Sequence, residues 1–211
     1  MANWKLKKKK QEGWVVKNIR PDEFLQDPFL YYTDDEVEKY ARSSGMRRAQ
    51  EKIANRVIEL LDLEPGSSLL DLGSGPGLTA EVYRDFGYEV TCLDLIPKMV
   101  EKAREKSFEA FSGDMKNVGE LFNGRKFNGV VSVSALQWIK SKEDLKKLAQ
   151  GIYSLLEKNS PLIIQFYPKS EQEMKENAKV FAQNGFEGEI KIDWPDIPKN
   201  RTIYLALKRK G

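Results

Sequence analysis

The sequence predicts an α/β fold built on a doubly wound, mostly parallel sheet of seven strands. From residue 67 onward, short apolar segments alternate with amphipathic segments of helical period, the order in which strands and helices follow one another in such a sheet. A turn with glycine at alternate positions, residues 73–77, joins the first expected strand to the next helix. Only residues 195–200 separate the last two expected strands, too few for a parallel crossover, so these strands should form a C-terminal antiparallel hairpin.

Two helices are expected before the sheet. Thr33 and Glu36 fit a capping box with acidic residues in the first turn, so a helix should begin there and run to about Arg42. We expect Ser43-Ser44-Gly45 to interrupt it and a second helix to run to about Asp62. Pro65-Gly66 should end this unit.

The elements of the sheet region follow from the same patterns. We expect strands at residues 67–72, 88–93, 108–112, 128–133, 160–167, 187–193 and 202–208. We expect helices near residues 77–86, 97–106, 117–122, 142–157 and 170–183.

A chain of 211 residues is long enough for one large domain with an appendage. We expect a basic N-terminal extension over residues 1–29 and a single domain over residues 30–211, with a helical lid at 33–62 and a sheet core at 67–208. The lysine cluster at 5–10 either contacts phosphates or is a solvated tail.

The composition excludes several kinds of chemistry. The chain has no histidine, which removes Ser-His and Cys-His catalysis and makes a transition-metal site improbable, so no metal is expected. A single cysteine, Cys92, excludes a disulfide framework and fits a reducing compartment, so we expect a cytoplasmic protein. No apolar stretch suggests contact with a membrane.

Acidic residues end the first three expected strands. The first precedes the glycine turn, and its pattern, Asp71-x-Gly73-x-Gly75-x-Gly77, resembles motif I of the class I methyltransferases that bind S-adenosylmethionine. A carboxylate beside the turn would repel a pyrophosphate but suits a ligand with an ammonium and a sulfonium group. Asp94 has the spacing of a residue that accepts hydrogen bonds from ribose hydroxyls, although it could be an ordinary loop aspartate.

Polar and aromatic residues follow the fourth and fifth strands. Gln137 and Trp138 come after the fourth strand, where open α/β sheets bind ligands, and Tyr167 ends the fifth. These residues are candidates for contact with a substrate base, because an aromatic ring at this edge can stack on a flipped or single-stranded base. The alternative for Trp138 and Tyr167 is ordinary core packing.

Several longer motifs carry a more specific resemblance. They are Phe29-Leu-Tyr-Tyr32, Ser134-Ala-Leu-Gln-Trp138, Gln165-Phe-Tyr-Pro168, Asn184-Gly-Phe-Glu-Gly188 and Ile192-Asp-Trp-Pro195. Together with the glycine turn, they make residues 28–208 similar to the eukaryotic methyltransferases that modify N7 of a guanine in small-subunit ribosomal RNA. The resemblance implies a class I, Rossmann-like methyltransferase that acts in rRNA processing and ribosome biogenesis. A small-molecule methyltransferase and a non-catalytic ribosome assembly factor remain as alternatives.

The resemblance also implies a cofactor site and partners. S-adenosylmethionine should contact the residues Asp71, Gly73, Ser74, Gly75, Gly77, Asp94, Leu95, Asp114 and Met115, with Tyr32 and Tyr40 closing over its methionyl end. Asp114 should read the adenine. The expected partners are ribosomal RNA or the small ribosomal subunit, and a small zinc-containing activator that pairs with the sheet edge at Phe108–Ser112, where two phenylalanines are available.

Overall fold

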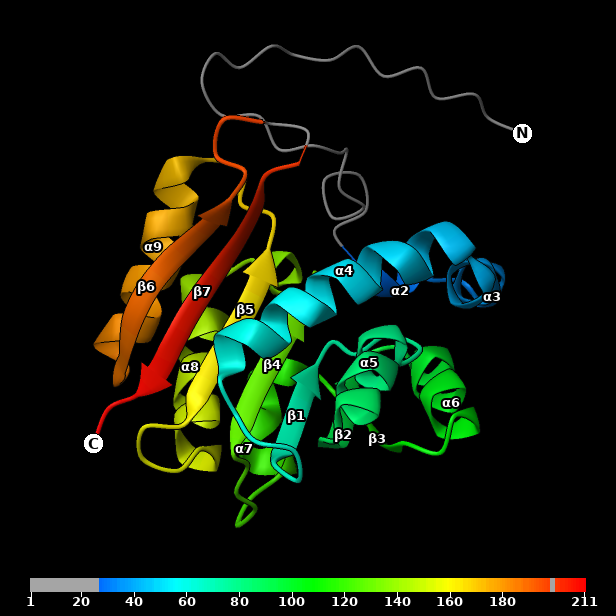
Figure 1. Cartoon of the computed structure of the whole chain (residues 1–211), viewed down its shortest axis with the longest axis horizontal. Helices are drawn as coiled ribbons and strands as arrows, with labels where there is room; N and C mark the ends of the chain where they lie inside the picture. The colour runs from blue at the N-terminus through cyan, green and yellow to red at the C-terminus, as the bar shows by residue number, and fades with distance from the viewer. Residues whose placement is uncertain (1–26, 198–199) are drawn as a thin grey trace.

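The computed structural model describes residues 27–197 and 200–211, which form a sheet of seven strands in the order β3-β2-β1-β4-β5-β7-β6 (Figure 1). The strands are β1 (Ser68–Leu72), β2 (Glu89–Asp94), β3 (Glu109–Ser112), β4 (Gly129–Val133), β5 (Pro161–Phe166), β6 (Phe186–Asp193) and β7 (Thr202–Arg209). The first five are parallel, and β7 pairs antiparallel with both β5 and β6. The predicted doubly wound sheet with a C-terminal hairpin is therefore confirmed. The lysine cluster and most of the expected extension over 1–29 lie outside the described residues.

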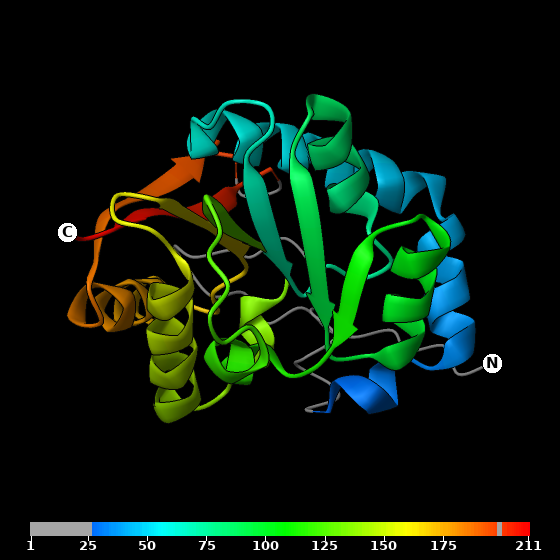
Figure 2. The same ribbon diagram turned by 90° about the horizontal axis from the view of Figure 1, so that it is seen from below.

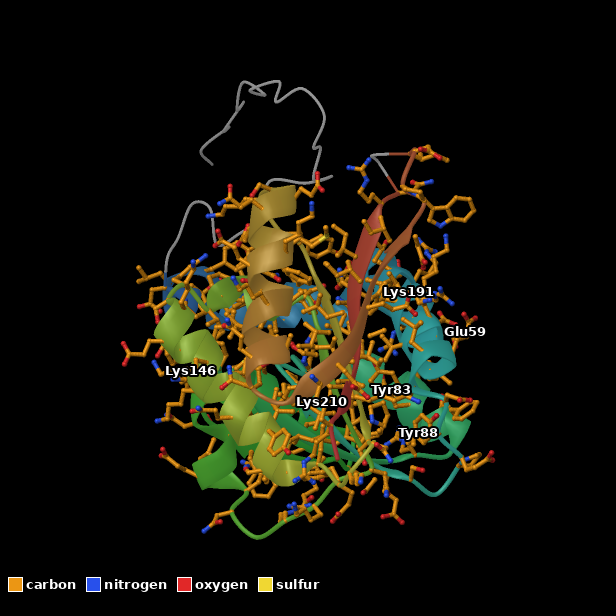
Figure 3. All side chains as sticks on the ribbon, turned by 90° about the vertical axis from the view of Figure 1, so that its left-hand side faces the viewer. Glu59, Tyr83, Tyr88, Lys146, Lys191 and Lys210 are labelled. Carbon is orange, nitrogen blue, oxygen red and sulfur yellow. The ribbon has the colours of Figure 1, made fainter. Side chains whose placement is uncertain are left out.

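Helices cover both faces of this sheet. One face carries α4 (Ser44–Leu61), α5 (Leu78–Phe86) and α6 (Pro97–Glu105), and the other carries α7 (Val118–Leu121), α8 (Lys142–Leu155) and α9 (Glu171–Gln183) (Figure 2). Figure 3, viewed from the β6 edge, shows Lys146 of α8 on one side and Glu59 of α4 on the other. Each helical layer shares a hydrophobic core with the strands, the larger one lying beneath α8 and α9.

The helices before the sheet begin at hydroxyl caps. The Thr33 hydroxyl accepts a hydrogen bond from the Glu36 N–H at 3.4 Å, and α3 (Asp34–Arg42) follows as predicted. The Ser43 hydroxyl accepts a bond from the Met46 N–H at 3.2 Å, so α4 begins at Ser44. The expected interruption is therefore one residue long, because Ser44 and Gly45 already belong to the first turn of α4.

Three short elements were not predicted. They are α2 (Pro28–Tyr31) and the 3₁₀ turns η1 (Met115–Asn117) and η2 (Leu136–Trp138). Each is too short to show a helical period in the sequence.

The β3 edge of the sheet differs from expectation in one respect. Of its two phenylalanines, Phe108 is buried, only 7% exposed, and packs against the Arg84 guanidinium, whereas Phe111 is 38% exposed. The edge therefore presents one phenylalanine and not two. Leu121, 47% exposed on α7, is a further apolar side chain on this side of the molecule.

All five parallel strands end at the same edge of the sheet, where β6 also ends and β7 begins (Figure 1). The loops that follow these strands, together with α2, α3 and α4, enclose the candidate site. No helix in residues 27–197 or 200–211 is long and apolar enough to span a membrane.

Candidate active site

A cavity of about 550 Å³ opens at the carboxyl edge of the parallel strands, a volume typical of small-molecule sites. The predicted site residues on its wall are Tyr32, Tyr40, Gly73, Gly75, Asp94, Leu95, Asp114, Met115, Gln137, Trp138 and Tyr167. Asp71, Ser74 and Gly77 are not on the wall. The fold thus brings the predicted cofactor side and the predicted substrate side into one cavity.

The glycine turn needs its glycines for two reasons. Gly73 and Gly75 have positive φ angles of 72° and 55°, which other residues rarely adopt. A Cβ at Gly73 would lie 2.3 Å from the Cβ of Ala135, whereas a Cβ at Gly75 would meet nothing within 4 Å. Gly73 therefore permits close packing on the loop after β4, and Gly75 leaves the backbone open to the cavity. Gly77 instead caps α5 and faces the Phe108 ring, 3.2 Å from where its Cβ would be.

Asp94, at the end of β2, holds the glycine turn in place. Its Oδ2 accepts a hydrogen bond from the Gly75 N–H at 2.8 Å, and its Oδ1 accepts one from the Ile96 N–H at 2.9 Å. Each oxygen keeps a second lone pair that can accept from a ligand hydroxyl. Burial raises the pKa of Asp94 to about 6, although these N–H groups favour the charged form.

Asp71 lies beneath the turn and not on the cavity wall. Its side chain is fully buried, and its Oδ2 accepts a bond from the Thr79 hydroxyl at 2.9 Å. Its Oδ1 and the buried Ser74 hydroxyl have no hydrogen-bond partner among the described residues. Burial raises the pKa of Asp71 to about 7, and the charge of Asp94 adds to the rise.

Asp114 follows β3 and begins η1. Its Oδ1 accepts from the Lys116 N–H at 3.0 Å, and its Oδ2 lies 3.2 Å from Lys116 Nζ. Lys116 is the only cationic side chain among the described residues of the wall, which also include the carboxylate of Asp144. The wall therefore has an excess of negative charge.

The loop after β4 is held by a buried amide that sequence reasoning missed. Ser134 has a φ of 56°, and its hydroxyl donates to Oε1 of the fully buried Gln165 at 2.9 Å. Gln137 Nε2 donates to the Ser134 carbonyl at 2.6 Å, which orients the Gln137 carboxamide. Gln137 Oε1 has no partner within the described part of the chain. The loop thus presents an oriented, unpaired acceptor.

Aromatic rings form the part of the wall next to Gln137. The Trp138 ring lies 6.5 Å from Tyr31 and 6.0 Å from Tyr32, and Tyr32 lies 6.4 Å from Tyr40, all between ring centroids. Trp138 is half-buried on the cavity wall and does not belong to the hydrophobic core. Trp138 therefore lines the cavity and is not part of that core, and its stacking role stays a prediction.

Several other residues of the wall were not anticipated. Tyr31, Met46, Gln50 and Ile53 reach it from α2 and α4, and Lys116 and Asp144 reach it from the other side. The sequence contained a signal for Gln50, because this polar residue lies on the same helical face as the apolar residues Ala54, Val57 and Leu61.

These features fit a cationic nucleoside. The unpaired acceptors, the open Gly75 backbone and the excess of carboxylates match a ligand with hydroxyl and ammonium donors and a sulfonium charge. Neighbouring aromatic faces also favour positive charge. The residues present therefore fit S-adenosylmethionine.

Comparisons with known proteins agree with this fit. Residues 70–164 match the family model described as a methyltransferase domain. An 18S rRNA (guanine(1575)-N(7))-methyltransferase of Saccharomyces cerevisiae is 33% identical over 84% of this chain and 68% of its own length. An 18S rRNA (guanine-N(7))-methyltransferase of Mus musculus is 32% identical over 92% of this chain and 73% of its own length.

Solved structures show the same fold at low sequence identity. The complex between the Haloferax volcanii Trm112 methyltransferase activator and a methyltransferase matches with a TM-score of 0.68 at 18% identity, over 84% of this chain and 97% of the other. Magnesium protoporphyrin IX methyltransferase from Synechocystis, with bound S-adenosylmethionine, matches with a TM-score of 0.66 at 17% identity, over 91% and 99%. The chain is an S-adenosylmethionine-dependent methyltransferase and belongs to the family of the 18S rRNA (guanine-N(7))-methyltransferases.

Proposed function

We propose that this protein transfers a methyl group from S-adenosylmethionine to N7 of a guanine in small-subunit ribosomal RNA. One observation carries the proposal: a single cavity joins a carboxylate-rich glycine turn, suited to the cofactor, to an aromatic and amide wall suited to a purine. The names of the curated relatives support the choice of guanine N7. A cytoplasmic location is part of the same proposal.

In this proposal, the cofactor lies along the carboxyl ends of β1, β2 and β3. Asp94 accepts from the ribose hydroxyls, Asp114 and the Met115 N–H read the adenine, and Leu95 packs beside them. Gly75 lets the ligand approach the backbone, Gly73 lines the site while it packs on Ala135, and Tyr32 and Tyr40 cover the methionyl end of the ligand. Asp71, Ser74 and Gly77 act from beneath the turn, Asp71 through its charge.

The substrate side needs little acid–base chemistry from the protein. When bound, S-adenosylmethionine supplies an electrophilic methyl group. N7 of neutral guanine carries a free lone pair and accepts a methyl group without losing a proton, so no general base is required. This agrees with a chain that has no histidine. Gln137, Trp138 and Tyr167 then have to orient the base and exclude water.

The proposal includes a small activator subunit at the β3 edge. An unpaired strand with an exposed aromatic side chain is a surface to which another sheet can add a strand. Phe111 is that side chain, and its ring lies 5.1 Å from Phe122. The solved complex of a methyltransferase of this fold with an activator supports the presence of such a partner.

Transfer to ribosomal subunits tests the reaction. The protein is incubated with methyl-labelled cofactor and purified small subunits, and labelled nucleotides are mapped. The proposal expects label at a single guanine, with strand cleavage by a treatment specific for N7-methylguanine. Label in small molecules alone, or binding to subunits without transfer, would contradict it and favour the two alternatives described above.

A further inference from the structure

Gln50 is a buried polar side chain on the cavity wall to which no role has been given. It is 7% exposed, and the other buried residues of α4 are apolar. Its Nε2 donates to the Tyr40 hydroxyl at 3.0 Å, and its Oε1 has no partner among the described residues. A buried carbonyl without a partner costs stability, so this oxygen is expected to meet a donor in the functional state.

Tyr40 complements Gln50 in the same part of the cavity. Its hydroxyl accepts the bond from Gln50 Nε2, which leaves its own proton available to an acceptor. Burial raises the pKa of Tyr40 to about 12, so the hydroxyl stays protonated at neutral pH. The pair therefore offers one acceptor, Gln50 Oε1, and one donor, the Tyr40 hydroxyl.

The pair lies over the middle of the site. Tyr40 comes from α3 and Gln50 from α4, and both line the same cavity as Asp94, at the end of β2, and Tyr167, directly after β5. Between those strands lie β1 and β4, with Gly73 packed on Ala135. Because Tyr40, Gln50 and Asp94 line one cavity, a ligand whose ribose is at Asp94 can extend its remaining arm toward this pair.

We propose that Gln50 and Tyr40 hold the amino-acid end of S-adenosylmethionine. Gln50 Oε1 accepts from the α-ammonium group, and the Tyr40 hydroxyl donates to the α-carboxylate. The zwitterionic end of the ligand needs one acceptor for its ammonium group and one donor for its carboxylate. Lys116, the single cationic side chain on the described wall, is already paired with Asp114. The inference rests on the cofactor placement of the proposed function and adds Gln50 to it as a positioning residue.

Two ligands separate this role from a general effect on the cavity. S-adenosylhomocysteine carries the amino-acid end, and 5′-methylthioadenosine has the same nucleoside and sulfur without it. In calorimetric titrations of the full chain, Gln50→Met should weaken S-adenosylhomocysteine binding at least about tenfold and leave 5′-methylthioadenosine binding within about twofold. Tyr40→Phe should show the same selectivity with a smaller loss. Gln172→Met, an exposed glutamine on α9, is the matched control.

The outcomes that contradict the inference are distinct. An equal loss for both ligands would mean that Gln50 only shapes the cavity, and normal binding of both with slower transfer to ribosomal subunits would place Gln50 at the base. Methionine removes the unpaired buried oxygen together with the hydrogen bond from Nε2 to the Tyr40 hydroxyl, so the melting temperature of the unliganded variant should change little. If Gln50→Met does not fold, Gln50→Glu serves instead, because it keeps the acceptor and should retain S-adenosylhomocysteine binding. A failure to methylate ribosomal RNA would overturn the proposed substrate without changing the ratio of the two affinities.

Discussion

Asp94 combines two tasks in one side chain. It anchors the glycine turn through the Gly75 N–H and the following loop through the Ile96 N–H, and its remaining lone pairs face the cavity. From the sequence alone, Asp94 could be either a ligand contact or an ordinary loop aspartate. The structure shows that this carboxylate holds the turn, and our proposal assigns the ribose contact to the same carboxylate.

Removal of this carboxylate should therefore weaken cofactor binding. Asp94→Ala is expected to cost about 1–3 kcal/mol of S-adenosylmethionine affinity, because the ribose hydroxyls and the Gly75 and Ile96 N–H groups lose their acceptor. Calorimetry measures the change, and Asp85→Ala, on the exposed side of α5, is the control. Unchanged affinity would reject the assignment of Asp94.

Asp71 gives a prediction about pH. Its folded-state pKa of about 7 lies above the unfolded value of 3.8, so the folded protein holds a proton that the unfolded chain releases, and stability falls as pH rises through this interval. The positive sulfonium group of S-adenosylmethionine favours the ionised form of the Asp71 carboxyl group. The ratio of S-adenosylmethionine affinity to S-adenosylhomocysteine affinity should therefore rise between about pH 6 and about pH 7.5.

The control for this prediction is Asp71→Asn, which cannot ionise. It should remove the pH dependence of the affinity ratio and should raise the melting temperature at neutral pH, because a buried, partly unpaired carboxylate is lost. A ratio that does not change with pH in the unmodified protein would show that Asp71 does not act on the cofactor through its charge.

At the scale of elements, α3 is the helix that supports the Asp94 loop. Val37 is fully buried against Ile96 and Met99, and Lys102 Nζ of α6 lies 2.7 Å from the Glu38 carboxylate. Ile96 follows Asp94 by two residues. Docking of α3 and the position of the Asp94 loop are therefore linked by direct packing.

Truncation of Val37 should loosen this contact. Val37→Ala leaves a small void that a short helix with one fully buried side chain tolerates poorly. Hydrogen exchange of the α3 amides should become at least about tenfold faster, with slower exchange restored by saturating cofactor. Val180→Ala, on α9 across the sheet, should leave α3 exchange unchanged. If Val37→Ala does not change exchange in α3, the helix is held by other contacts.

At the scale of the whole molecule, the order of the strands leaves β3 and β6 as the two edges of the sheet. The β3 edge is short, close to the site and bears the exposed Phe111, with Arg125 Cζ 6.0 Å from its ring centroid. A partner at this edge would extend the sheet next to Asp114, which follows β3.

A charge on this edge should prevent assembly without changing the cavity. Phe111→Glu is expected to abolish co-purification with a co-expressed activator subunit and to leave the affinity for S-adenosylmethionine within about twofold, because an unpaired charge opposes burial at an interface. Phe86→Glu changes another exposed phenylalanine, on α5, and should retain the partner. Retention of the activator by Phe111→Glu would place its binding surface elsewhere.

The sequence alone determined the order, type and approximate bounds of the long elements. Capping residues and hydrophobic periods are local, so the helix expected at 97–106 is found at Pro97–Glu105, and the strand expected at 67–72 is found at Ser68–Leu72. The short turns at Pro28–Tyr31 and Leu136–Trp138 contain too few residues to show such a period.

Only the tertiary structure decided the surroundings of individual side chains. Asp71 lies beneath the glycine turn, Phe108 is buried under it, and Gln50 reaches the cavity from α4. The residue type at each of these three positions is also compatible with a different placement. Burial and hydrogen-bond pairing depend on segments far apart in the chain. The pKa values of the carboxylates and the unpaired acceptor of Gln50 therefore arise from packing, which no local pattern of residues encodes.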